Sequence, residues 1–248
     1  MIKIFTFIGS QAGNKSNTAL YAKNILDKVV EKSHETIEID FYTADKIKIN
    51  SCRSCNNCFL TCSCPLDESD DMRSLKEKMI NADSIIWGTP IYAHNVSGDM
   101  KIFIDRLSYW MHLMRLAGKA GVVITTTSYS GSTFTAAYLE KIMNNTGIRV
   151  IGKFNFIPHL IEEHMDKGAS QDDYEQCADI ILEYFSGKKA IGSDEKLESI
   201  FQSYKKVMMN PVRTQSAEYH YWLENGYLSC NNFDEVIKKM NSSKKCCG

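Results

Sequence analysis

The chain has 248 residues, of which 44% are hydrophobic, so it can bury a full core, and 29 Lys and Arg against 30 Asp and Glu leave a net charge of −1. This balance gives no electrostatic basis for binding nucleic acid. No apolar stretch approaches the roughly 20 residues that cross a membrane. The apolar run around Lys3 is also too short for a secretory leader, so we expect a cytoplasmic protein that contacts neither nucleic acid nor membrane.

The first elements are an apolar strand over residues 2–8, a loop of small and hydroxyl residues, and a helix whose apolar positions recur from Ala19 onward. Such a loop presents backbone N–H groups and hydroxyls at a helix N-terminus, where a phosphate binds. The alternative is that Ser16 or Asn17 merely caps the helix. The sequence contains neither GxGxxG nor the Walker A motif, which favours the single phosphate of a mononucleotide.

Four further strands alternate with helices. The strands are predicted at residues 36–41, 84–88, 121–126 and 149–156, and the helices between them at 72–80, 99–110 and 134–145. This alternation predicts a parallel sheet covered by helices on both faces. Ligands of such sheets bind at the carboxyl ends of the strands. Three small-residue or proline-containing loops, at residues 9–18, 89–98 and 126–133, fall at that edge.

The pattern changes after residue 157. Helices are predicted at residues 172–185, 194–208, 217–224 and 233–240. The tail that carries Cys246 and Cys247 is expected to fray.

Two motifs carry a resemblance to a known family. Gly9-Ser10, followed after five intervening residues by Ser16-Asn17-Thr18, resembles the phosphate loop of the flavodoxin-like NAD(P)H-dependent FMN reductases. Their flavin-ring loop and the helix after it are similar to Thr89-Pro90-Ile91-Tyr92 and to the run from Ser97-Gly98 through Met100-Lys101 to Asp105-Arg106. The resemblance implies a flavodoxin-like three-layer α/β fold with a five-stranded parallel sheet. Residues 1–160 would form the FMN-binding domain and residues 161–248 a helical C-terminal extension.

The resemblance also implies a set of residues that bind FMN. We expect the phosphate at Ser10, Ser16, Asn17 and Thr18, the ring at Pro90, Ile91, Tyr92 and Asn95, and the pyrimidine edge under the loop with Thr126, Ser128 and Gly131. His94 is a candidate general acid, but hydride chemistry at a flavin requires none, so no catalytic side chain is predicted. Asp105 and Arg106 are interpreted as an ion pair or a subunit contact.

Five of the nine cysteines lie close together, at Cys52, Cys55, Cys58, Cys62 and Cys64. In a cytosolic protein such clustering indicates metal or redox chemistry. CxxCxxC spacing brings three thiolates within reach of one cuboidal cluster, and the five-residue gap before Cys64 matches the iron-sulfur flavoproteins, which share this fold. We predict a [4Fe–4S] cluster on Cys52, Cys55, Cys58 and Cys64, with Cys62 spare. An empty thiol loop and a structural zinc site remain the alternatives.

The predicted function is FMN-dependent oxidoreduction, in which NAD(P)H is the electron donor and a quinone, a flavin or another small oxidant is the acceptor. The alternative is an iron-sulfur flavoprotein that carries electrons through FMN and a [4Fe–4S] cluster, with a ferredoxin as partner. A third hypothesis is a flavin-binding regulatory protein. Large apolar residues in the extension predict a homodimer or homotetramer; these residues are Tyr219, Tyr221, Trp222, Tyr227 and Leu228.

Overall fold

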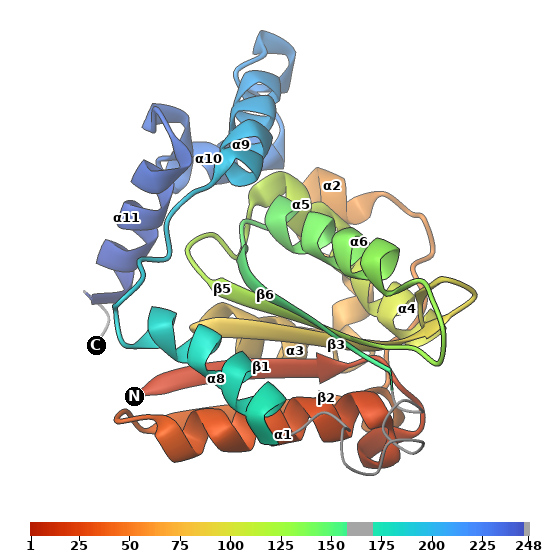
Figure 1. Cartoon of the computed structure of the whole chain (residues 1–248). Coiled ribbons are helices and arrows are strands. Elements are labelled where there is room, and N and C mark those ends of the chain that lie inside the picture. Colours follow the sequence, from red (N-terminus) through yellow and green to blue (C-terminus); the bar gives the residue numbers. More distant parts are fainter. Residues whose placement is uncertain (158–170, 246–248) are drawn as a thin grey trace.

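A parallel five-stranded sheet is the middle layer of the computed structural model, which describes residues 1–157 and 171–245 (Figure 1). The strand order is β2-β1-β3-β5-β6, and a short strand β4 pairs antiparallel with the end of β3. The strands are β1 (Ile2–Ile8), β2 (Ile37–Thr43), β3 (Ser84–Tyr92), β4 (Asn95–Val96), β5 (Ala120–Thr126) and β6 (Arg149–Phe156). The predicted flavodoxin-like fold is therefore confirmed.

The strand order creates a crevice at one edge of the sheet. After β1 the chain passes outward to β2 and then returns across β1 to form β3 on its other side. The connections from β1 and β3 therefore leave in opposite directions, and their carboxyl ends flank the position where ligands of such sheets bind. Pairing of Ile8 with Gly88 and of Pro90 with Thr126 brings the three predicted loops to this edge.

Helices cover both faces of the sheet, because each face is lined by apolar side chains. On one face lie α3 (Met72–Asn81), α4 (Gly98–Arg106), α5 (Ser108–Leu113) and α6 (Ser132–Asn145). On the other lie α1 (Asn17–Lys32) and α8 (Gln171–Phe185), which pack side by side (Figure 1). Cys177, Ala178 and Ile181 of α8 join the same buried cluster as the sheet residues. The first described helix of the predicted extension thus covers the sheet, while the predicted boundary at residue 160 lies outside the described residues.

Two segments differ from the sequence-based prediction. Strand β3 continues four residues beyond the predicted end at 88 and turns back into β4 through Ala93 and His94, whose φ angles are 49° and 61°. Positive φ at both central residues is the geometry of a tight two-residue hairpin. The helix predicted at 99–110 is two helices, because the backbone leaves helical geometry at Leu107 (φ −101°, ψ 0°).

The last three helices form a third apolar cluster, which also includes Met114 and Ala117 from the segment before β5. The helices are α9 (Glu195–Met208), α10 (Ala217–Glu224) and α11 (Phe233–Lys245). Trp222 and Tyr227 are fully buried there, and the Trp222 ring stacks on Phe201 with centroids 5.7 Å apart. The Trp222 Nε1 atom donates a hydrogen bond of 2.8 Å to the carbonyl of His112 in α5. Intrachain packing therefore accounts for the largest of the aromatic residues from which an oligomer was predicted.

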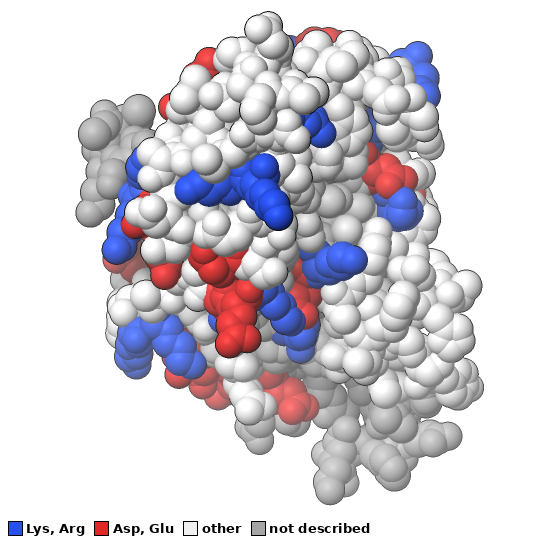
Figure 2. Space-filling model, turned by 90° about the horizontal axis from the view of Figure 1, so that it is seen from above, with Lys and Arg blue, Asp and Glu red and all other residues white. Residues whose placement is uncertain are grey.

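The surface of the described residues adds two observations. Figure 2 shows basic and acidic side chains interspersed on the face seen from above Figure 1, with broad uncharged areas between them. No described helix combines the length and apolar character needed to span a bilayer. Cys246 and Cys247 lie outside the described residues.

Candidate flavin site and cysteine segment

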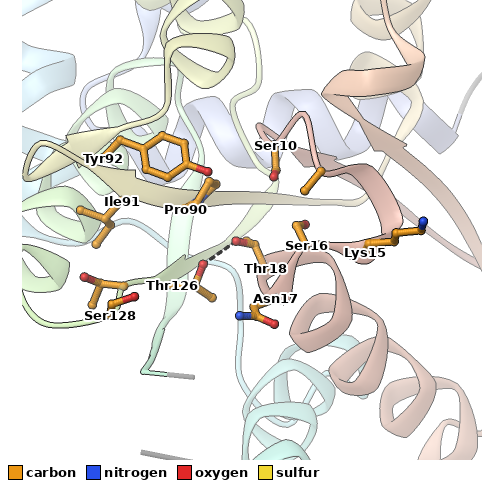
Figure 3. A pocket seen from close by; sticks show the side chains of 12 residues that line it. Ser10, Lys15, Ser16, Asn17, Thr18, Pro90, Ile91, Tyr92, Thr126 and Ser128 are labelled. Atoms are coloured by element: carbon orange, nitrogen blue, oxygen red, sulfur yellow. Dashed lines mark hydrogen bonds between the residues drawn. The ribbon is translucent and has the colours of Figure 1, made fainter. Parts of the chain in front are cut away.

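The three loops at the carboxyl edge of the sheet line an open cavity of about 330 Å³ (Figure 3). It is lined by Ser10, Ala12, Lys15, Ser16, Asn17, Thr18, Pro90, Ile91, Tyr92, Thr126, Thr127 and Ser128. Nearly all of the residues predicted to bind the flavin are therefore brought together, although the chain separates the first loop from the third by more than 100 residues. Ala12, Lys15 and Thr127 also line the cavity but were not among the predicted binding residues, and their position inside the first and third loops is the signal that could have identified them.

The first loop ends at the N-terminus of α1. The Ser16 hydroxyl accepts a hydrogen bond of 3.2 Å from the Ala19 amide, so Ser16 is indeed the helix cap. The first backbone bond of the helix runs from Leu20 to the Ser16 carbonyl. The amides of Asn17 and Thr18 precede that bond and have no partner within the helix. Both amides belong to residues that line the cavity, so the helix cap and an anion site coexist in this loop.

A direct contact joins the first loop to the third. The hydroxyl oxygens of Thr18 and Thr126 lie 2.6 Å apart, and both residues are buried (Figure 3). Gly88 makes room for this contact, because a Cβ atom there would lie 3.0 Å from the Thr18 methyl and 2.5 Å from Ile8. The two loops therefore form one continuous wall of the cavity.

Ser97 joins the first loop to the second. Its hydroxyl donates a 2.5 Å hydrogen bond to the Gly9 carbonyl and accepts one of 3.2 Å from the Met100 amide, which caps α4. Its backbone amide donates to the Thr89 hydroxyl at 3.0 Å. Both loops are thus fastened to the N-terminus of α4.

Two residues predicted to bind the ring lie outside the cavity lining. Asn95 is exposed, and its side-chain oxygen accepts a 2.8 Å hydrogen bond from the Val96 amide. Gly131 has φ +93°, and a Cβ atom there would lie 3.1 Å from the His94 backbone and 3.2 Å from Ile91. The absence of a side chain at Gly131 therefore lets the third loop pack closely against the β3–β4 hairpin. The Tyr92 side chain is 61% exposed at the mouth of the cavity.

The five clustered cysteines lie on an excursion of the chain that we call the cysteine segment, residues 50–70, which contains α2 (Asn57–Thr61). Cys52 and Cys55 are exposed, and Cys58, Cys62 and Cys64 are half-buried free thiols. Burial raises the pKa of Cys58, and the thiols of Cys64, Cys52 and Cys55 raise that pKa further.

Cys62 has different surroundings. Burial raises the pKa of its thiol, and among the charged groups Glu218 of α10 has the largest effect in the same direction. The four predicted ligands therefore interact electrostatically through Cys58, while Cys62, which Cys58 also affects, is influenced more strongly by Glu218 of α10.

The cysteine segment has the donor atoms of an iron-sulfur site, but the thiols are not assembled into one. No group of three or more His, Cys, Asp or Glu side chains within residues 1–157 and 171–245 is arranged to hold a metal ion. The Ser54 amide does donate to the Cys52 sulfur at 3.4 Å, a contact of the kind that tunes cluster thiolates.

Comparison with known proteins gives concordant results. The model of the family described as NADPH-dependent FMN reductase matches residues 2–160. An iron-sulfur flavoprotein of Archaeoglobus fulgidus is 29% identical over 213 residues, which cover 84% of this chain and 93% of that protein. The iron-sulfur flavoprotein MJ1083 of Methanocaldococcus jannaschii is 35% identical over 92 residues, 37% of this chain and 45% of its own length.

Solved structures agree on the fold. The crystal structure of an apo NADH:FMN oxidoreductase superposes with a TM-score of 0.56 at 20% identity, covering 79% of this chain and 94% of that one. At this level of identity the likeness concerns the fold.

Proposed function

The chain belongs to the NADPH-dependent FMN reductase family and is a flavin oxidoreductase, and we propose that it transfers electrons from NADH or NADPH to a small-molecule acceptor such as a quinone, a flavin or another oxidant. The observation that supports this proposal is the cavity at the carboxyl edge of the sheet, walled by three loops with a helix N-terminus at one end. When bound there, FMN would supply the hydride and electron chemistry.

The residues of the first loop suit the phosphate end of FMN. Ser10, Ser16 and Thr18 bring buried hydroxyls to the cavity. The amides at the start of α1 add N–H donors at the positive end of the helix dipole. Lys15 lines the same end of the cavity and supplies a cation near the dianion.

The second and third loops suit the ring. Pro90 and Ile91 lie on the extended end of β3, where the backbone can approach a flat ligand edge, and Tyr92 stands at the mouth. Thr126 and Ser128 face them from the third loop (Figure 3). His94 lies outside the lining, which favours a reaction that needs no protein acid. We propose that Asn95 and Gly131 affect ring binding indirectly, by fixing the conformation of the β3–β4 hairpin that carries Ile91 and Tyr92.

A second candidate function is that of an iron-sulfur flavoprotein that carries electrons. It is favoured by the names of the two relatives and by the shared neighbourhood of four cysteines. The thiolates of Cys52, Cys55, Cys58 and Cys64 would hold the [4Fe–4S] cluster, and a ferredoxin would be the exchange partner. We further propose a cytoplasmic homodimer or homotetramer.

One anaerobic experiment separates the two functions. Protein purified without oxygen is analysed for flavin and iron and is then mixed with NADH, NADPH or reduced ferredoxin while the visible absorbance of the flavin is followed. Rapid bleaching by a nicotinamide supports the reductase. Bleaching by ferredoxin alone, together with about four irons per chain, would instead support the carrier.

A further inference from the structure

The cysteine segment leaves and rejoins the fold at one point. Where it rejoins, the Asp70 carboxylate accepts a 2.9 Å hydrogen bond from the Asn50 amide. Just outside it, the Lys48 amide donates a 2.7 Å hydrogen bond to the Asp71 carboxylate, and the Asp71 amide donates one of 3.0 Å to the Lys48 carbonyl. The entry and the exit of the segment are therefore closed against each other.

The guanidinium of Arg106 lies directly beneath this closure. Arg106 is the last residue of α4, and its side chain is fully buried. It donates a 2.9 Å hydrogen bond to the Asn50 carbonyl, one of 2.7 Å to Asp67, and another to Asp70. Arg106 thus forms ion pairs with Asp67 and Asp70 and not with its neighbour Asp105, whose partner is Lys101. The planar fork of an arginine suits such multiple, directed contacts, which the single ammonium of lysine cannot reproduce.

Helix α4 connects this closure to the flavin site. Its N-terminus is held to Gly9 and Thr89 through Ser97. Met100 also packs so closely on Gly9 that a Cβ atom there would lie 2.7 Å from the Met100 Cβ. The nine residues of α4 make a rod about 13 Å long. One end of this rod is fixed to the flavin loops and the other to both ends of the cysteine segment.

We propose that Arg106 is a positioning residue that, through α4, holds the cysteine segment at a set place relative to the flavin loops and keeps Cys58 and Cys64 partly buried. The functional meaning of this arrangement rests on the proposed flavin function, because electron transfer between the flavin and the cysteine segment would depend on the distance between them. The contacts themselves do not depend on any bound group.

The experiment compares three variants of the full-length, FMN-loaded protein after iron has been removed by a chelator. Arg106→Lys keeps the charge but loses the fork, and Asp70→Asn weakens the closure without leaving a buried cation alone, since Asp67 remains. Asp105→Asn is the matched control, because the ion pair that Asp105 makes among the described residues is with Lys101, on the exposed side of the same helix. Iodoacetamide labelling of each cysteine is followed by peptide mass spectrometry, and FMN affinity by fluorescence quenching.

We expect Cys58 and Cys64 to react about tenfold faster in the first two variants, since local opening exposes them, while the control labels at the wild-type rate. FMN affinity should change less than about threefold, because the phosphate loop is untouched. Unchanged labelling in a folded Asp70→Asn protein would overturn the proposal. A parallel rise at the buried Cys177 would also overturn it, by showing general loosening. If labelling changes as expected but no nicotinamide reduces the flavin, the proposed function fails while the positioning role stands.

Discussion

Thr18 and Thr126 place their hydroxyl oxygens 2.6 Å apart, although 108 residues separate them in the chain. Thr18 lies in the first turn of α1, and Thr126 ends β5. The pair therefore fixes the width of the cavity between the proposed phosphate end and the third loop. A hydroxyl held in this way can donate to a ligand while it accepts from its neighbour.

Replacing Thr18 with Val should weaken FMN binding with little change of shape. Loss of one hydroxyl that bonds a charged acceptor costs about 1.5–3 kcal/mol, or roughly ten- to over a hundredfold in the dissociation constant. Fluorescence quenching measures this constant. In a double-mutant cycle with Thr126→Val, the two effects should not add, because the residues are in contact. Full additivity would show that the contact does not matter for binding.

Two glycines near the start of α4 should respond oppositely to replacement by alanine. Gly9, in the first loop, packs against Met100 of α4, whereas Gly98 is the first residue of α4. A Cβ atom at Gly9 would lie 2.9 Å from the Met100 amide nitrogen, so Gly9→Ala should destabilise the fold by about 1–3 kcal/mol and reduce FMN affinity. A Cβ atom at Gly98 meets nothing within 4 Å, so Gly98→Ala should stabilise by about 0.4–1 kcal/mol. Urea denaturation of both variants checks the opposite signs, and equal effects would refute the packing argument.

Cys58→Ser should abolish iron binding and leave FMN in place, if the cysteine segment holds a cluster. The cause is loss of a thiolate in the neighbourhood that Cys58 shares with Cys64 and Cys52. Cys62→Ser is the matched control and should retain iron, since Glu218 is the main charge near that thiol. Iron and flavin analyses of anaerobically purified variants make the measurement. If only the Cys62 variant lost iron, Cys62 would be the cluster ligand and Cys58 would not.

The protein should lose stability at alkaline pH through Cys177. Burial, assisted by Asp173, raises the pKa of this thiol from 9.0 to about 12. The folded state thus favours the neutral thiol, so this contribution is fully present below pH 9 and is lost as pH rises towards 12. Denaturation at pH 8 and at about pH 10.5 should show a smaller decrease for Cys177→Ala than for wild type. The exposed Cys52→Ala serves as control, and identical slopes for all three proteins would contradict the prediction.

Truncation after Phe185 should remove the proposed oligomer contacts and weaken flavin binding. The remaining chain keeps the sheet and α8 but exposes Met114 and Ala117, which the C-terminal cluster covers. Monomer or aggregate is therefore expected by light scattering. Native mass together with full flavin content would exclude a role for these helices in assembly.

The sheet and its three loops could be predicted because each signal is local: an apolar run ends in small, hydroxyl or proline residues. The β3–β4 hairpin was missed since Ala93-His94 lacks the Asn or Gly that such turns favour. The place of α8 could not be read from its own pattern either, because the same apolar stripe suits any partner, and its contact with the sheet is decided by distant residues such as Ile4 and Ile124. Asn95 was assigned from its position in a motif, whereas its side chain is engaged by the neighbouring backbone.

The closure between Asn50 and Asp70 has a consequence for protein engineering. Because the chain enters and leaves at one point, the whole cysteine segment, including Asp70, resembles a cassette that a short linker could replace without altering the strand register. Such an exchange would have to include position 106, since an arginine without its two carboxylates would be left as an isolated buried charge. The buried ammonium of Lys76 in α3, which pairs with Asp67 at 2.6 Å, would lose its partner in the same way. The portable unit is thus the cysteine segment together with Arg106 and Lys76.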